Sequence, residues 1–267
     1  MNNQSKESPW RVNSVTKAFR ILEQFTPAQE VLTLTQLSQR LDMPKSTLLN
    51  MLKTLESEGY LYRMPNAQGY QLGYKVLLLG YNMRSSMSII QYAIPFMEDL
   101  LAKTKETIYL TTHSGGQVLY LDAVYNSRRF GKYSVTGKLL PMHCTGCGKA
   151  MLSYMDEAEV LNIVKQEGLS KKTPYTITDV DRLLEELAIS RKRGYTVDHE
   201  EETLGVKCVA TAIRDTNGKP VGAISIQGTT LSITDDLINK YANLSASVCT
   251  ILSEHANLFP VQPIVAQ

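Results

Sequence analysis

Between residues 33 and 60 the apolar positions follow the spacing of two short helices joined by a tight turn. The second predicted helix, residues 44–56, has one apolar face (Leu48, Met51, Leu52, Leu55) and one face of polar groups (Ser46, Asn50, Lys53). Pro44 suits its first turn, where the N–H that proline lacks would have no partner. Gly59 suits its end, because glycine tolerates the left-handed conformation that closes many helices. Such a helix can lie in a DNA groove, or it can simply belong to an all-helical core.

The flanking segments distinguish these two interpretations. A helix with an apolar stripe precedes the pair, with Ser14 as its expected cap and Pro27 as its end. Two aromatic-rich runs, residues 60–63 and 69–72, follow the pair, and the turn-forming residues between them predict a β-hairpin. Three helices followed by a two-stranded hairpin is the order of a winged helix-turn-helix domain, so the sequence favours DNA binding.

Residues 73–88 predict a further helix with an apolar patch too continuous for an isolated, exposed linker: Val76, Leu77, Leu78, Leu79 and Tyr81. Packing on a partner subunit would explain this patch, and so would packing on the winged-helix domain. We prefer the partner subunit, because a dimer doubles the base contacts that one head can make.

From residue 89 onward, predicted helices alternate with antiparallel hairpins. Strands are expected at residues 107–112, 117–124, 130–135, 206–214 and 220–227, with an Asn217-Gly218 turn between the last two. Helices are expected at residues 89–101, 156–167, 179–193 and 234–257, and a loop runs into a helix at 140–150. Thr178 is the expected cap of the third of these helices, and Gly194 its stop. This order indicates an α+β domain with one central sheet.

The amino-acid composition indicates the general class of protein. Hydrophobic residues make up 43% of the 267 residues and charged residues 20%, which suits a globular chain of one large domain or two ordinary ones. The N-terminus has no signal pattern, and no apolar run approaches the ~20 residues of a membrane span. Four cysteines do not form a disulfide framework in a chain of this length. We therefore expect a cytoplasmic protein that has no contact with a membrane.

The net charge of +2 is unevenly distributed. Residues 1–88 hold ten basic and six acidic residues, whereas residues 89–267 hold eighteen basic and twenty acidic residues. A modestly basic N-terminal third fits a DNA-binding head on a body with a different task.

Few motifs of enzyme chemistry are present. No histidine stands in a metal-binding spacing, there is no G-x-S-x-G elbow, and residues 143–150 lack two residues of a phosphate-binding loop. Cys144 and Cys147 form a C-x-x-C motif before a predicted helix, whose dipole can lower a thiol pKa. A zinc site there would need further ligands, for which His143, His199 and Cys208 are the candidates. Otherwise these are small buried residues that line a cavity.

Polar residues also interrupt the apolar C-terminal strands. Ser225 and Gln227 alternate with isoleucines and so share one strand face, while Asp198 and Cys208 lie on or beside neighbouring strands. They could be solvated exterior positions, or the oriented donors and acceptors of a ligand pocket. Periodicity alone does not separate these alternatives.

Several stretches together resemble one family, the IclR-type bacterial transcriptional regulators. In the first half these are residues 13–22 (NSVTKAFRIL), 43–47 (MPKST) and 55–60 (LESEGY). In the second half they are residues 140–145 (LPMHCT), 148–150 (GKA), 193–201 (RGYTVDHEE) and 205–210 (GVKCVA), the last leading to Asp215 and Gly218. Both halves match in the expected order, across residues 12–258.

The resemblance implies an α+β chain with a winged helix-turn-helix DNA-binding domain (residues 12–74), a linker helix (75–88), a GAF-like α/β effector-binding domain (89–258) and a tail (259–267). By matching positions, it also implies an effector pocket formed by Thr145, Gly146, Cys147, Asp198, Cys208, Ser225 and Gln227. Gln227 stands where a serine is frequent in the family, which implies a ligand larger, or differently bonded, than a two- or three-carbon acid. Members act as dimers or dimers of dimers, with no cofactor.

We therefore expect a ligand-responsive transcriptional regulator and not an enzyme. A repressor of catabolic genes with an organic-acid or sugar-acid effector is preferred to an activator. The expected contacts with double-stranded DNA come from Lys45, Ser46, Thr47, Asn50 and Lys53 on the helix and from Arg63 and Gln68 in the wing. A homodimer would favour a near-palindromic operator with half-sites ~34 Å apart.

Two features of the sequence concern the DNA contacts and the functional class. Asn50 and Met51 stand where the family more usually carries a basic pair, which implies different DNA contacts at that point. The alternative from another functional class is a redox or metal sensor that uses Cys144, Cys147 and Cys208.

Overall fold

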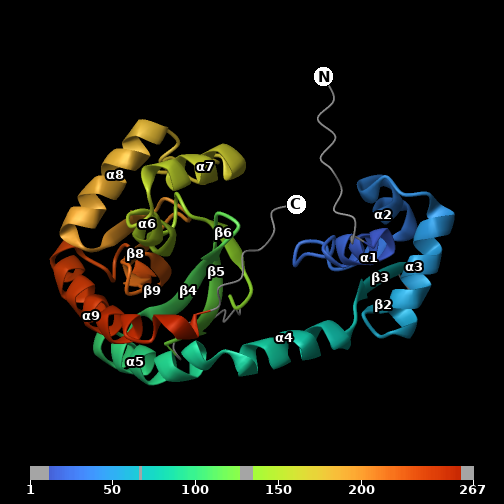
Figure 1. The fold of residues 1–267 in the computed structure, drawn as a ribbon, viewed down its shortest axis with the longest axis horizontal. Helices are drawn as coiled ribbons and strands as arrows, with labels where there is room; N and C mark the ends of the chain where they lie inside the picture. Colours follow the sequence, from blue (N-terminus) through green and yellow to red (C-terminus); the bar gives the residue numbers. More distant parts are fainter. Residues whose placement is uncertain (1–11, 66–67, 127–134, 260–267) are drawn as a thin grey trace. The chain divides into compact units, whose positions relative to one another are not determined.

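A computed structural model describes residues 12–65, 68–126 and 135–259 of the chain. The chain divides into two compact units, residues 1–85 and 86–267. Each unit has helices and a sheet of its own (Figure 1) and a core of its own, and the two are described in turn.

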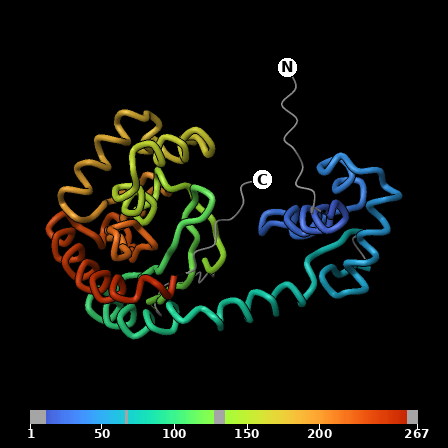
Figure 2. Tube along the Cα trace, in the orientation of Figure 1, coloured from blue at the N-terminus to red at the C-terminus, as the bar shows by residue number. Residues whose placement is uncertain are grey.

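The described part of the first unit begins with three helices and a small antiparallel sheet, and a fourth helix follows them. The helices are α1 (Asn13–Leu22), α2 (Leu34–Leu41) and α3 (Lys45–Ser57), and the strands are β1 (Leu32–Thr33), β2 (Leu61–Arg63) and β3 (Gly69–Leu72). The predicted hairpin of β2 and β3 is confirmed, with Tyr62 opposite Gln71, and Figure 2 follows the chain from α1 to this hairpin. The two residues of β1, too few to show an alternating pattern, pair with β3 and were not predicted.

The core of this unit is formed by the apolar faces of the three helices. Leu48 and Leu52 of α3 are fully buried, as are Ile21 of α1 and Leu37 of α2. Gly59 ends α3 with a φ of +78°, as its sequence position predicted. The fold is therefore that of the predicted winged helix-turn-helix.

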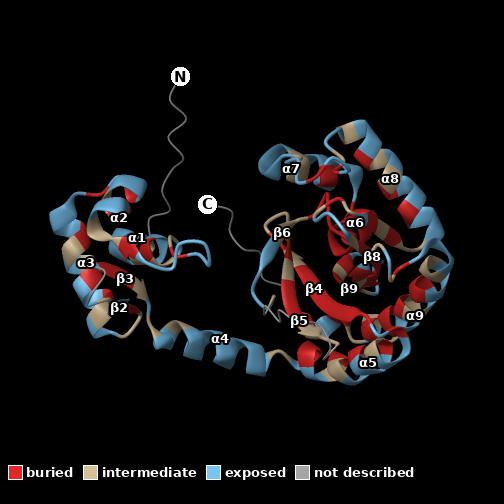
Figure 3. Ribbon diagram, turned by 180° about the vertical axis from the view of Figure 1, so that it is seen from behind, coloured by how far each residue is buried: buried red, intermediate tan, exposed pale blue. Residues whose placement is uncertain are grey.

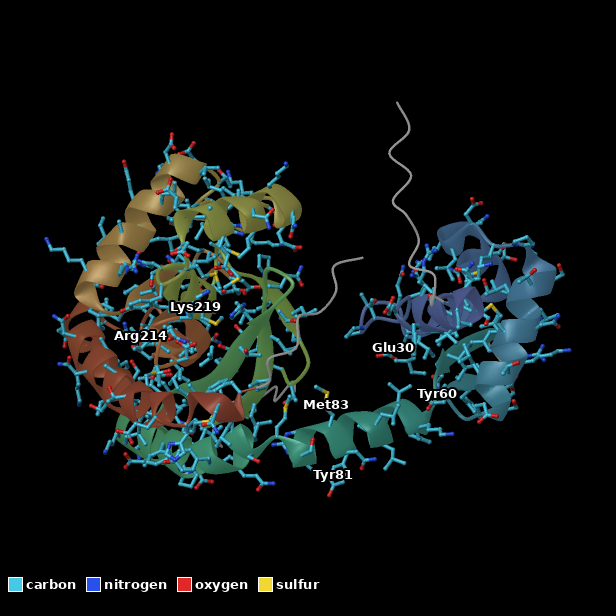
Figure 4. All side chains as sticks on the ribbon, in the orientation of Figure 1. Glu30, Tyr60, Tyr81, Met83, Arg214 and Lys219 are labelled. Atoms are coloured by element: carbon cyan, nitrogen blue, oxygen red, sulfur yellow. The ribbon has the colours of Figure 1, made fainter. Side chains whose placement is uncertain are left out.

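Helix α4 (Tyr74–Ser86) follows the hairpin and exposes large apolar side chains. Leu77 is 72% exposed and Tyr81 is 65% exposed, and Tyr74 and Leu78 are exposed at positions that complete one helical stripe with them. Figure 3 shows α4 as exposed along its length, and Figure 4 shows Tyr81 and Met83 extending away from its backbone. The winged-helix domain therefore does not cover this stripe.

The second unit is built on a six-stranded antiparallel sheet in the order β6-β5-β4-β9-β8-β7. The strands are β4 (Thr107–Ser114), β5 (Gln117–Val124), β6 (Leu139–Pro141), β7 (Thr196–His199), β8 (Val206–Arg214) and β9 (Pro220–Thr229). The four longest strands were predicted, whereas the short edge strands β6 and β7 were not. The strand predicted at residues 130–135 falls almost wholly outside the described residues.

Helices cover both faces of this sheet (Figure 1). One face packs on α5 (Ser88–Thr104) and α9 (Asp235–Ser253), and the other on α6 (Gly146–Leu152), α7 (Glu157–Glu167) and α8 (Val180–Arg193). Alternate residues of each strand therefore enter two different cores. Ile224 and Ile226 of β9 belong to the core beneath α5 and α9, and Ala223 belongs to the opposite one.

Two predicted helix caps are wrong. Helix α1 begins two residues earlier than expected, because the Val12 carbonyl already accepts helical hydrogen bonds, and this places Ser14 inside the first turn. Helix α8 is capped by Asp179 and not by Thr178, because the Asp179 carboxylate accepts the Arg182 N–H at 3.0 Å.

The end of the described chain differs slightly from the prediction. Helix α9 stops at Ser253, and a 3₁₀ turn (Ala256–Leu258) follows it. Phe259, which the sequence assigned to a tail, is buried in the core of the second unit. No helix in the described part of the chain has the length and apolar character needed to cross a membrane.

Candidate functional site

The exposed face of α3 is polar and basic. Lys45, Ser46, Thr47, Asn50 and Lys53 are all exposed, while Leu48, Leu52 and Leu55 on the opposite side are buried. In the described residues no hydrogen bond to the Asn50 side chain is found. The Thr54 hydroxyl donates to the backbone carbonyl of Asn50 at 3.0 Å and leaves its side-chain amide unengaged. The side-chain amide is therefore available to a base edge, where asparagine can form a bidentate pair with adenine.

The two predicted wing residues are exposed as well. Arg63 ends β2, and Gln68 precedes β3 with a left-handed φ of +47°. Both flank the tip of the hairpin, where a wing can reach the backbone or minor groove of a duplex.

The second unit contains a cavity of about 200 Å³ on the side of the sheet that α6 covers. All seven residues predicted for the effector pocket line it: Thr145, Gly146, Cys147, Asp198, Cys208, Ser225 and Gln227. They come from four segments, namely the start of α6 and the strands β7, β8 and β9.

Strand register brings these residues together. Asp198 pairs with Cys208, and Cys208 pairs with Gln227, so the three form one row across the sheet. Ser225 pairs with Tyr109 in the next row on the same face. The Gln227 amide donates to the Tyr109 hydroxyl at 3.4 Å, and its oxygen accepts from the Cys208 thiol at 3.5 Å. The polar strand residues are therefore interior groups that face a cavity.

Two glycines give α6 close contacts, Gly146 with the sheet and Gly148 with the loop that precedes the helix. A Cβ at Gly146 would lie 3.3 Å from the Cβ atoms of Cys208 and Ala210, and one at Gly148 would lie 2.3 Å from the Met142 carbonyl oxygen. The Gly146 carbonyl also accepts the Thr196 hydroxyl at 2.7 Å, which ties α6 to β7. Small residues at the start of α6 thus set the depth of the cavity.

Asp198 is the most perturbed carboxyl group of the cavity. It is 3% exposed, and one of its oxygens accepts the Glu201 N–H at 2.8 Å. Burial raises its pKa to about 7, and the nearby Glu201 carboxylate acts in the same direction. The Glu201 N–H and the Lys149 charge oppose this rise, but do not cancel it.

Lys149 is a buried charged residue behind the cavity, and the sequence placed it only within the GKA stretch of the family resemblance, without a role. It is 1% exposed, and its ammonium donates to the Val197 carbonyl at 2.8 Å and to the Glu201 carboxylate. Glu186 of α8 lies 3.9 Å away. The ion pair therefore joins α6 to the segment that follows β7.

The sequence also missed several residues of the lining, because they carry no motif. The lining includes the aromatic rings of Tyr109 and Tyr120, the apolar Leu140, and the charged Lys138 and Glu202. Alternation placed the two tyrosines in strands, but only the packing of α6 shows which strand face becomes a cavity wall.

The cysteines are unsuited to thiolate chemistry. Cys144, Cys147 and Cys208 are buried, and burial raises the pKa of Cys144 and of Cys147 to about 12 and that of Cys208 well above its ordinary value. A thiol that keeps its proton at neutral pH is a poor nucleophile and a poor metal ligand. Among the described residues no cluster of three or more His, Cys, Asp or Glu side chains could hold a metal ion.

Comparison with protein families finds a match for each half of the chain. The IclR helix-turn-helix domain matches residues 14–65, and the C-terminal domain of the bacterial transcriptional regulator IclR matches residues 82–251.

Individual proteins agree with these matches. The chain is 30% identical to the transcriptional repressor IclR of Escherichia coli strain K12, over 86% of this chain and 85% of that protein. It is 32% identical to the HTH-type transcriptional regulator KdgR of Dickeya chrysanthemi, over 93% of this chain and 81% of that protein. A solved IclR-type regulator from Alicyclobacillus acidocaldarius superposes with a TM-score of 0.81 at 25% identity, over 92% of this chain and 100% of that one.

Proposed function

The chain belongs to the IclR family of bacterial transcriptional regulators, and from this premise we propose that it represses catabolic genes until a small organic or sugar acid binds in the C-terminal cavity. The observation that carries the proposal is the cavity, where seven small or polar residues from four segments converge. The E. coli relative is named a repressor, which supports this direction of regulation.

On the DNA side, α3 is proposed to enter the major groove. Ser46, Thr47 and Asn50 would face base edges, and Lys45 and Lys53 would contact phosphates. Arg63 and Gln68 would extend the contact through the wing. The exposed stripe of α4 supports a homodimer, because a partner helix would bury apolar surface that is otherwise in water. A two-fold dimer then requires a near-palindromic operator.

On the effector side, the lining offers hydrogen-bonding groups on an otherwise tight, partly apolar wall. The Ser225 hydroxyl, the Gln227 amide and the Tyr109 hydroxyl suit a ligand with several oxygen atoms. Lys138 supplies a positive charge at an exposed position of the lining. An acid of modest size that carries hydroxyl or keto groups matches this set. To act as a switch, the ligand must bind with different affinity to the state of the protein that can bind DNA and to the state that cannot.

The test is a DNA-binding assay in which acids are added to the complex. Duplexes that the full-length protein retains are selected from a random library, and binding is followed by fluorescence anisotropy while pyruvate, gluconate or 4-hydroxybenzoate is titrated. We expect tight, salt-dependent binding that at least one of these acids weakens.

Two variants assign the roles in this assay. Ser225→Ala should keep the affinity for DNA and lose the response to the acid, whereas Asn50→Ala should lose affinity for DNA. A Ser225→Ala protein that responds like the parent would exclude Ser225 from the effector site. The absence of any salt-dependent DNA binding by the parent would refute the proposed function.

A further inference from the structure

The lining of the cavity is acidic. Asp198 and Glu202 both line it, whereas Lys138 is the single basic side chain among its described lining residues. Lys138 is exposed and Glu202 is half-buried, so water screens both charges, but Asp198 is buried. An acid that enters this cavity as an anion would meet the Asp198 carboxylate in a place where charge repulsion is weakly screened.

Among the described residues, no basic side chain is found in an ion pair with Asp198. The positive charge that lowers the pKa of Asp198 is that of Lys149. Its ammonium, however, donates its hydrogen bonds to the Glu201 carboxylate and the Val197 carbonyl. The other titratable groups that face Asp198 or its immediate neighbours are the thiols of Cys144, Cys147 and Cys208, the carboxylates of Glu201 and Glu202, and the phenols of Tyr109 and Tyr120. Lys172 is a further basic group on this side, and its charge acts on the Cys144 thiol. The single hydrogen bond to the Asp198 side chain among the described residues is the one from the Glu201 N–H.

We propose that Asp198 takes up one proton when an anionic effector binds, and that its neutral carboxyl group then donates a hydrogen bond to the acid group of the effector. This inference rests on the proposed function, because it concerns the same cavity. The proton comes from solvent and moves to the Asp198 carboxylate, so the binding of a monoanion leaves the charge of the cavity unchanged. No covalent bond is made or broken.

This arrangement makes effector binding depend on pH. A carboxyl group whose pKa is about 7 is mostly protonated at pH 6 and mostly ionised at pH 8. If only the protonated form accepts the anion, the dissociation constant rises by about tenfold between these two pH values.

The experiment is isothermal titration of the full-length protein with the acid that displaces DNA in the assay above, taken from pyruvate, gluconate and 4-hydroxybenzoate. Each titration is run at pH 6 and pH 8, in two buffers with different heats of ionisation, which reveals proton uptake. All three acids remain ionised at both pH values. We expect about tenfold weaker binding at pH 8, with uptake of close to one proton per site at pH 8 and little at pH 6.

Asp198→Asn tests the residue itself. The carboxamide can donate the same hydrogen bond without titrating, so its affinity should be the same at pH 6 and pH 8, with no proton uptake. Asp99→Asn removes an exposed carboxylate from α5 and should keep the full pH dependence of the parent. If the Asp198→Asn protein fails to fold, proton uptake by the parent protein still decides the matter.

Several results would overturn the inference. One is equal affinity of the parent protein at both pH values with no proton uptake. Another is an unchanged pH dependence in Asp198→Asn. If none of the three acids displaces DNA, the proposal of an acidic effector is refuted, and this inference is refuted with it. The proposal that the protein binds DNA is unaffected by that result. Failure of the effector-free protein to bind DNA refutes the proposed function instead, so the two failures are distinguishable.

Discussion

Replacement of the buried Lys149 by methionine should be one of the most damaging single changes in the second unit. The ammonium of this residue lies between the Val197 carbonyl and the carboxylate of Glu201, and is 1% exposed. Methionine fills a similar volume but carries no charge. The substitution therefore removes the interaction and leaves the packing of α6 largely in place.

The expected cost follows from what remains behind. Glu201 is 6% exposed, and among the described residues its Oε2 atom already has no hydrogen-bond partner. Loss of Lys149 would strand this carboxylate, and removal of one partner from a buried pair costs about 3–5 kcal/mol of unfolding free energy. Burial already raises the pKa of Glu201, so protonation can relieve part of the cost, which should be larger at pH 8 than at pH 5.

The assay is urea denaturation of the full-length protein, with hydrogen exchange used to follow the second unit. Lys103→Met is the matched control, because Lys103 forms a 2.6 Å pair with Asp99 in which both side chains are about half exposed. Pairs of that kind contribute about 1 kcal/mol or less. The double variant Lys149→Met/Glu201→Leu should regain much of the loss. Equal costs for Lys149→Met and Lys103→Met, or a double variant as unstable as the single one, would refute the reasoning.

Four further predictions concern other parts of the molecule. In the parent protein the Asp198 contribution to unfolding free energy should fall by about 4 kcal/mol at most as the pH rises from 4 to 7. The reason is that the Asp198 carboxyl has a pKa near 3.8 in the unfolded chain and about 7 in the native chain, so the native state binds the proton more tightly. Asp198→Asn should remove this fall of unfolding free energy with pH in urea titrations, and an equal fall in the variant would contradict the prediction. Asn50→Ala should cost about 1–3 kcal/mol of sequence-specific DNA binding by anisotropy, and an unaltered site preference would exclude a base contact. Gly148→Ala should destabilise the second unit by about 1–3 kcal/mol, because its Cβ would meet the Met142 carbonyl; an unchanged melting temperature would show that α6 can shift freely. Leu77→Asp should leave the winged helix folded but shift the protein toward monomer in sedimentation velocity, and an unchanged oligomeric state would remove α4 from the interface.

The winged helix could be predicted from sequence because its signals are local. The apolar stripe of α3, the turn between β2 and β3, and Gly59 all depend on residues close together in the chain. The misplaced caps at Ser14 and Thr178 show the limit of such signals: several neighbouring residues can start a helix, and packing decides which one does.

The second unit was predicted less completely because short edge strands carry little pattern. Strands β6 and β7 have three and four residues, and they are strands only because β5 and β8 offer them partners. Phe259 likewise looks like part of a tail in the sequence, and its burial becomes evident only from the core beneath α5 and α9, in which its ring packs.

The cavity shows most clearly which properties the sequence could predict and which depend on the tertiary structure. Alternation along residues 220–227 determined that Ser225 and Gln227 share one strand face, and the resemblance of local motifs named seven of the lining residues. Sequence periodicity could not say whether that face meets water or protein, because the period is the same in both cases. The answer came from α6, α7 and α8, which cover this face of the sheet and turn polar strand positions into interior groups.

Burial also decided the chemistry of individual side chains. From the sequence alone, Cys144 and Cys147 allowed redox or metal chemistry but favoured a cavity wall, Asp198 was an ordinary acid, and Lys149 was noted only within the GKA stretch, with no role of its own. Local sequence determined where helices, strands and the DNA-reading surface lie, because those depend on neighbours in the chain. Only the tertiary structure could raise the pKa of Asp198 and pair Lys149 with Glu201, because the removal of water and the approach of distant charges exist only after folding.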